Sequence, residues 1–180
     1  SVTIDDLLNY DLSTITNVFT SNNSNGKTKI LVTSINQEDE ENIELVNEKA
    51  VAGYSKGFED PQFVQKLPVF HLPFLPKNKK YRVFPIQGDS MLPFPDKSMV
   101  FVEYIEDWKQ LKDESLCIVV TKSEGVVFKK VFNYIDDRLC LLLSSLNPLY
   151  KPYIVPVEEV NEIWKFVGYY SSQEPQNITI

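Results

Sequence analysis

Short apolar segments separated by turn residues recur along the chain from Tyr81 onward. They are rich in Val, Ile, Leu, Phe and Tyr, and several alternate apolar with polar positions, which is typical of β-strands. Strands are predicted at residues 81–86, 99–103, 116–121, 126–133, 139–144 and 163–170. Residues 136–138, between two of these segments, are predicted to form a hairpin turn. Because helical periodicity is scarce after residue 66, the sequence predicts a mainly β domain of twisted antiparallel sheets.

The N-terminal part has a different composition. Residues 1–12 carry apolar residues at helical spacing and are interpreted as the end of a helix. Residues 13–27 are rich in Ser, Thr and Asn, which is typical of a linker. We therefore expect the end of another domain at 1–12, a linker and arm at 13–48, and the main domain at 49–180. Extended segments are expected at 29–35, 43–51 and 67–73, and a turn or short helix at 59–63.

Charge and composition argue against several classes of protein. The formal net charge is −7 and the sequence pI is about 4.8, so these residues are not expected to bind nucleic acid by themselves. The sequence has no run of about 18 or more apolar residues, and no transmembrane helix or membrane partner is predicted. Cys117 and Cys140 lie in apolar segments and are expected to be buried free thiols of a cytoplasmic protein. No cofactor and no metal site are expected, because His71 is the only histidine and the cysteines do not cluster.

A serine and a lysine are the candidate catalytic pair. Ser90 lies in Gly88-Asp89-Ser90-Met91, a turn that follows the predicted strand at 81–86, and Lys129 lies in the predicted strand at 126–133. A serine hydroxyl and a neutral lysine amine supply a nucleophile and a base without histidine or metal. The Gly-Asp-Ser sequence alone is also typical of an ordinary turn, so the pair depends on the surrounding residues.

The lysine can act as a base only if its pKa is lowered. An exposed lysine has a pKa of about 10.4 and is a poor base at neutral pH, whereas burial among apolar groups lowers that pKa. In a strand, Val127, Lys129 and Val131 share one face, so the amine is expected to lie among branched aliphatic side chains. Lys130 faces the other way and is the alternative base.

Taken in order, these segments resemble the C-terminal autoprotease domain of LexA-type repressors, a family that includes phage CI repressors and UmuD. The resemblance covers about residues 49–170 and implies a β-ribbon or barrel-like domain with an extended N-terminal arm. Its parts are Ala52-Gly53, Gly88-Asp89-Ser90-Met91 with Pro93, Pro95-Asp96-Lys97-Ser98, Val127-Phe128-Lys129-Lys130-Val131, and Ser144-Ser145-Leu146-Asn147-Pro148 with Tyr150. The chain departs from the family pattern at Leu146, where members commonly carry Asp before the Asn-Pro pair.

The resemblance also implies a reaction. Ser90 would attack the Ala52–Gly53 peptide bond of the same chain, and Lys129 would act as the general base. Backbone N–H groups of Asp89 and Ser90 would form the oxyanion hole. Cleavage in this family separates the DNA-binding part of a repressor from the part that holds the dimer together.

The resemblance implies partners as well. Residues 1–12 would end a helix-turn-helix domain, and DNA would be bound only through that domain, most of which lies outside this sequence. The C-terminal domain would form a homodimer. The family's trigger, a RecA filament on single-stranded DNA, is a candidate co-protease in an SOS response.

Two other functions are open to a chain with this sequence. A domain of the same fold could serve as the dimerisation or ligand-sensing domain of a transcriptional regulator without cleaving, in which case Ala52-Gly53-Tyr54 would be only a hinge. A peptidase acting on other proteins, such as a type I signal peptidase, also pairs serine with lysine, but it needs a membrane anchor that the sequence does not contain.

Overall fold

The structure is a computed structural model that describes residues 15–22, 28–35, 42–70, 72 and 74–173. The predicted helix end at 1–12 and His71 therefore lie outside the described residues. Within the described ranges, no helix is both long and apolar enough to cross a membrane.

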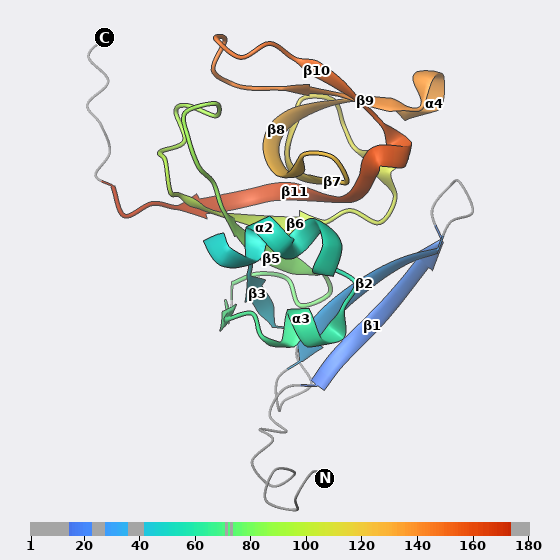
Figure 1. Ribbon diagram of the computed structural model, residues 1–180, viewed down its shortest axis with the longest axis vertical. Helices are drawn as coiled ribbons and strands as arrows, with labels where there is room; N and C mark the ends of the chain where they lie inside the picture. The colour runs from blue at the N-terminus through green and yellow to red at the C-terminus, as the bar shows by residue number, and fades with distance from the viewer. Residues whose placement is uncertain (1–14, 23–27, 36–41, 71, 73, 174–180) are drawn as a thin grey trace, which may run out of the picture.

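One curved sheet forms the body of the molecule (Figure 1). Across the described residues it has nine strands in the order β10-β9-β8-β7-β11-β6-β5-β3-β4. The strands are β3 Ile43–Leu45, β4 Val69–Phe70, β5 Tyr81–Pro85, β6 Met99–Tyr104, β7 Ser115–Thr121, β8 Gly125–Tyr134, β9 Cys140–Ser144, β10 Tyr153–Pro156 and β11 Val160–Tyr170. Neighbouring strands are antiparallel except β3 and β5, which are parallel. The predictions of a mainly β fold and of six strands after residue 80 are confirmed.

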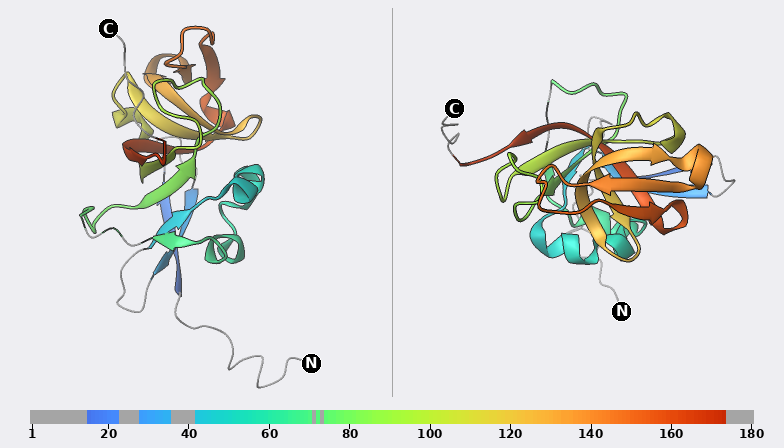
Figure 2. Two further views of the ribbon diagram at one scale, coloured as in Figure 1. Left: turned by 90° about the vertical axis from the view of Figure 1, so that its left-hand side faces the viewer. Right: turned by 90° about the horizontal axis from the view of Figure 1, so that it is seen from above.

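A separate two-stranded sheet comes before this body. Strands β1 (Ile15–Asn22) and β2 (Thr28–Ile35) pair antiparallel, with Val18 opposite Val32 and Phe19 opposite Leu31. The strand expected at 29–35 is confirmed, but the interpretation of 13–27 as linker is wrong for residues 15–22. Their β-branched and aromatic residues favour a strand once an apolar partner strand is available. The hairpin and the helices α2 (Glu48–Gly57) and α3 (Pro61–Gln65) lie at one end of the molecule, and β8 to β10 lie at the other (Figures 1 and 2).

The helical segments are short. They are α2 Glu48–Gly57, α3 Pro61–Gln65, α4 Ile135–Arg138, and the 3₁₀ turns η1 Trp108–Gln110 and η2 Val157–Glu159. Helix α3 confirms the short helix expected near 59–63, and β4 confirms an extended, edge-located segment within 67–73. The hairpin expected at 136–138 is confirmed, because β8 and β9 pair antiparallel on either side of it. Its connection is the helical turn α4, which is followed by Leu139 with φ of 52°.

The strand expected over 43–51 is wrong beyond Leu45. Residues 48–57 form α2, which packs against β8. The sequence Glu48-Lys49-Ala50 consists of strong helix formers. Tyr54 on the helix and Phe58 just after it are both buried, and Phe58 N–H donates to the Tyr54 carbonyl at 3.0 Å. The local alternation at 43–51 was therefore overridden by helix propensity and by the burial of these aromatic side chains.

The core lies on both faces of the sheet. Strand β7 alternates between two apolar clusters: Ile118 and Val120 belong to one, and Cys117 and Val119 belong to the other. A strand that is covered on both sides reads as a continuous apolar run rather than a strict alternation. Cys117 and Cys140 are free and buried, as predicted.

Candidate active site

The turn that carries Ser90 follows β5. Gly88 has φ of 81°, a backbone conformation that favours glycine, and its N–H donates to Asp96 Oδ1 at 2.7 Å. The N–H groups of Asp89 and Ser90 have no hydrogen-bond acceptor in the part of the chain that the structure describes. Backbone donors without an acceptor beside a serine hydroxyl are one requirement of an oxyanion hole.

A second loop, after β9, restrains this turn. Asn147 donates from its backbone N–H to the Ser90 carbonyl at 3.1 Å, and its side-chain amide donates to the Asp89 carbonyl at 3.1 Å. The Tyr150 hydroxyl donates to Asp89 Oδ1. These bonds hold Ser90 from outside its own turn, so the serine position depends on the segment that contains Asn147 and Tyr150.

The Lys129 side chain meets Ser90. On β8, Lys129 Nζ lies 3.1 Å from Ser90 Oγ and 3.0 Å from Ser145 Oγ. Burial lowers the pKa of Lys129, and the nearby Glu124 carboxylate opposes this shift only in part. A lowered pKa increases the fraction of neutral amine near neutral pH, which is the form that can accept a proton.

The alternative base lies elsewhere. Lys130 Nζ is 3.5 Å from Glu114 Oε2 and 5.5 Å from the centre of the Phe132 ring, on the opposite face of β8. In the part of the chain that the structure describes, no contact joins Lys130 to Ser90. Of the two lysines in this segment, only Lys129 has the geometry of a base for the serine.

The contact between Ser145 and the Lys129 amine was not predicted from the sequence. It belongs to the Ser144–Tyr150 segment used for the resemblance, but nothing in its local sequence distinguishes it from Ser144. Its hydroxyl reaches Lys129 because β8 and β9 pair with Lys130 opposite Ser144. This register places Ser145 next to the amine, and the hydroxyl positions the lysine side chain.

Ser90 and Lys129 border a cavity of about 370 Å³. It is lined mainly by apolar side chains, together with the turn residues Gln87 and Gly88. The lining residues are Val51, Pro85, Ile86, Gln87, Gly88, Ser90, Met91, Ile118, Val126, Val127, Phe128 and Lys129. Val51 comes from α2, immediately before the Ala52–Gly53 bond, so this bond lies close to the cavity along the chain.

In the structure described, the Ala52–Gly53 bond lies in a helix and not in an extended segment. Both residues lie within α2, and Val51 N–H donates to the Asn47 carbonyl at 2.9 Å in the first turn. The helical backbone conformation differs from the extended conformation that a peptide segment adopts when it pairs with a β-strand. A bond in this conformation has to leave the helix before a nucleophile can attack it.

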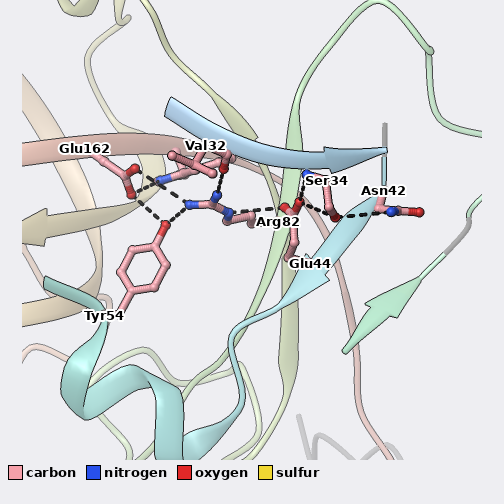
Figure 3. Close-up of polar contacts among 8 residues, drawn as sticks. Val32, Ser34, Asn42, Glu44, Tyr54, Arg82 and Glu162 are labelled. Atoms are coloured by element: carbon pink, nitrogen blue, oxygen red, sulfur yellow. Dashed lines mark hydrogen bonds and ion pairs between the residues drawn. The ribbon is translucent and has the colours of Figure 1, made fainter. Parts of the chain in front are cut away.

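A buried ionic cluster holds α2 against the sheet (Figure 3). Arg82 on β5 lies 3.3 Å from Glu44 Oε2 on β3 and 3.7 Å from Glu162 Oε1 on β11, and all three side chains are at most 2% exposed. The Tyr54 hydroxyl donates to Glu162 Oε2 at 2.7 Å and also contacts Arg82. A further bond runs from Arg82 to the Val32 carbonyl on β2.

The charge state of this cluster follows from its contacts. Burial by itself lowers the pKa of Arg82, but Tyr54, Glu44 and Glu162 raise it, and the net shift is above the ordinary value. The guanidinium therefore stays charged. Sequence reasoning missed the cluster, because Glu44 and Arg82 look like ordinary charged positions when each segment is read alone.

The described residues contain no group of three or more His, Cys, Asp or Glu side chains that could hold a metal ion.

A comparison with protein-family models identifies the class of this domain. The model for the Peptidase S24-like family matches residues 44–168, which is more than half of the chain. The chain belongs to this family of serine peptidases, the LexA, UmuD and CI C-terminal type. No curated protein matches the chain closely enough to add to this assignment.

Proposed function

We propose that this chain cuts its own Ala52–Gly53 bond, with Ser90 as the nucleophile and Lys129 as the general base. The observation that carries the proposal is the 3.1 Å contact between Lys129 Nζ and Ser90 Oγ. It occurs at a cavity that is also lined by Val51, the residue before the proposed cleavage site. The proposed nucleophile and base therefore border the same cavity as the residue that precedes the proposed cleavage site.

The reaction would proceed in two stages. Neutral Lys129 takes the proton from Ser90 Oγ as the oxygen attacks the Ala52 carbonyl carbon, and the N–H groups of Asp89 and Ser90 stabilise the oxyanion. The lysine then gives this proton to the Gly53 nitrogen, which leaves as an amine. Water, activated by the same amine, hydrolyses the ester between Ala52 and Ser90 and leaves a carboxylate on Ala52.

The proposal includes the regulatory role implied by the family resemblance. In it, residues 1–12 end a DNA-binding domain, the peptidase domain forms a homodimer, and a RecA filament promotes cleavage. The exposed end of β11 supports the dimer. Val167, Tyr169 and Tyr170 are 42%, 50% and 58% exposed there, and β7 pairs with β11 only as far as Lys165. An apolar, unpaired strand edge favours pairing with another chain.

A non-cleaving dimerisation domain is the second candidate. The helical conformation of Ala52 and Gly53 favours it, because a bond held in a helix is not available to Ser90. A peptidase that cuts other proteins is the third, and it predicts that one chain can cleave another.

Intact-mass spectrometry during incubation tests the proposal. The expected products are residues 1–52 and 53–180, formed faster at about pH 10 than at about pH 7. The sign follows from the amine: raising the pH increases the neutral fraction of Lys129 until its lowered pKa is passed. Ser90→Ala should abolish the products, and Lys129→Ala should slow them about a hundredfold or more. Lys130→Ala is the matched control and should cleave at the normal rate.

The dependence of the cleavage rate on protein concentration distinguishes self-cleavage from cleavage of other chains. Self-cleavage predicts that the fraction cleaved does not depend on protein concentration. It also predicts that a Ser90→Ala chain stays uncut when it is mixed with the normal chain. Cleavage of the Ser90→Ala chain in the mixture would show that the peptidase acts on other molecules. An intact chain at both pH values would favour the non-cleaving domain.

A further inference from the structure

The segment before the proposed cleavage site is part of the peptidase sheet. Strand β3 lies between β5 and β4, parallel to the first and antiparallel to the second. Leu45 N–H donates to the Pro68 carbonyl at 2.7 Å, and Val46 N–H donates to the Val83 carbonyl at 2.9 Å. Both acceptors come after residue 53, so a cut at Ala52–Gly53 would leave these bonds in place.

Apolar side chains on the same segment are buried against residues that follow the bond. Leu31 and Val46 are 2% and 0% exposed and belong to the same cluster as Phe84 and Trp164. Ile43 is 6% exposed and packs with Val83. Leaving the sheet would expose this apolar surface on both partners, which opposes separation.

An ion pair without solvent exposure also links the two parts. Glu44 lies before the bond and Arg82 lies after it, at 3.3 Å and with both side chains 0% exposed. Arg82 also donates to the Val32 carbonyl on β2, and Glu44 Oε1 accepts from Ser34 N–H at 2.7 Å. Departure of the N-terminal segment would leave Arg82 without two of its acceptors (Figure 3).

We propose that cutting Ala52–Gly53 does not by itself release the N-terminal part, which stays bound as a strand of the peptidase sheet in a nicked complex. This inference rests on the proposed self-cleavage. Hydrolysis breaks one peptide bond and adds one water, giving a carboxylate on Ala52 and an amine on Gly53, while the strand pairing and the Glu44–Arg82 pair remain. Separation of residues 1–52 from 53–180 then needs a second event that pulls β2 and β3 out of the sheet.

Size-exclusion chromatography and native mass spectrometry of the self-cleaved chain test this inference. Under native conditions the expected species has the mass of the uncut chain plus one water, and under denaturing conditions it gives the two fragments. Fragments that separate under native conditions would overturn the inference and leave self-cleavage intact. An uncut chain would instead overturn the proposed function.

A second arm tests retention without any self-cleavage. Residues 1–52 carrying an affinity tag are produced together with residues 53–180 that carry Ser90→Ala, and the untagged piece is expected to co-purify. Replacing Glu44 by Ala should speed dissociation of the two pieces about a hundredfold or more, because it removes one of the two carboxylates that face the buried Arg82 and the only one that lies on the N-terminal piece. Glu44→Gln, which keeps the size and an acceptor oxygen, should have a smaller effect in the same direction.

Glu103→Ala is the matched control. It removes a carboxylate whose ion pair with Lys79 is solvent-exposed, and it should change the dissociation rate by less than about fivefold. Failure of the pieces with normal Glu44 to co-purify, or equal dissociation rates for Glu44→Ala and Glu103→Ala, would contradict the inference.

Discussion

Replacing Arg82 by methionine tests how strongly the buried cluster stabilises the fold. The variant keeps a long apolar stem but leaves the carboxylates of Glu44 and Glu162, which are 0% and 1% exposed, without their cation. Removing one partner of a buried ion pair costs about 3–5 kcal/mol of the free energy of unfolding. Most of this cost is the uncompensated buried charge that remains.

Urea unfolding, followed by the fluorescence of the buried Trp164, measures this cost. A slope of about 2 kcal/mol per M is ordinary for a domain of this kind. The midpoint of unfolding of Arg82→Met should therefore fall by about 1.5–2.5 M. Lys79→Met is the control: it breaks the exposed pair with Glu103, and its free energy of unfolding should change by less than about 1 kcal/mol.

A triple variant separates charge from packing. Adding Glu44→Gln and Glu162→Gln to Arg82→Met removes the stranded anions and should restore a large part of the lost stability. The reasoning is refuted if Arg82→Met loses less than about 1 kcal/mol, as the exposed pair does. It is also refuted if the triple variant is no more stable than Arg82→Met alone.

Three further outcomes are expected. Tyr54→Phe keeps the ring but removes the hydroxyl that binds Arg82 and Glu162, so α2 should leave the sheet more readily. The rate of self-cleavage, measured by mass spectrometry, should therefore rise about tenfold, whereas the control Tyr81→Phe should leave it unchanged. Ser145→Ala should lower the cleavage rate about tenfold in the same assay, because the base loses its 3.0 Å partner. Burial raises the pKa of Cys117 to about 12, so this thiol should not react with a disulfide reagent at about pH 8 until urea unfolds the chain.

Most strands were predictable because their signals are local. The six segments after Tyr81 consist of residues that favour a pleated, half-buried surface, and turn residues separate them. Observed bounds differ from predicted bounds by at most one residue, except for the start of β11 at Val160. The turn at Gly88 was predictable for the same reason, since a glycine at positive φ needs no distant partner.

The N-terminal third was less predictable because its structure depends on distant residues. Residues 15–22 form a strand only with β2 as a partner, and a linker-like composition hides that pairing. At 48–57, the choice between strand and helix depends on where Tyr54 can be buried. Its hydroxyl partner, Glu162, is 108 residues away along the chain.

The sequence by itself determined the mainly β fold and the reactive groups that the chain carries, including Ser90, Lys129 and the glycine turn. These follow from side-chain chemistry and from periodicities of a few residues. Only the tertiary structure decided that Ser145 touches the lysine, that Ala52–Gly53 is held in a helix, and that Glu44 is buried against Arg82. Such contacts depend on strand order and register, which arise when segments far apart in the chain bury their surfaces against one another.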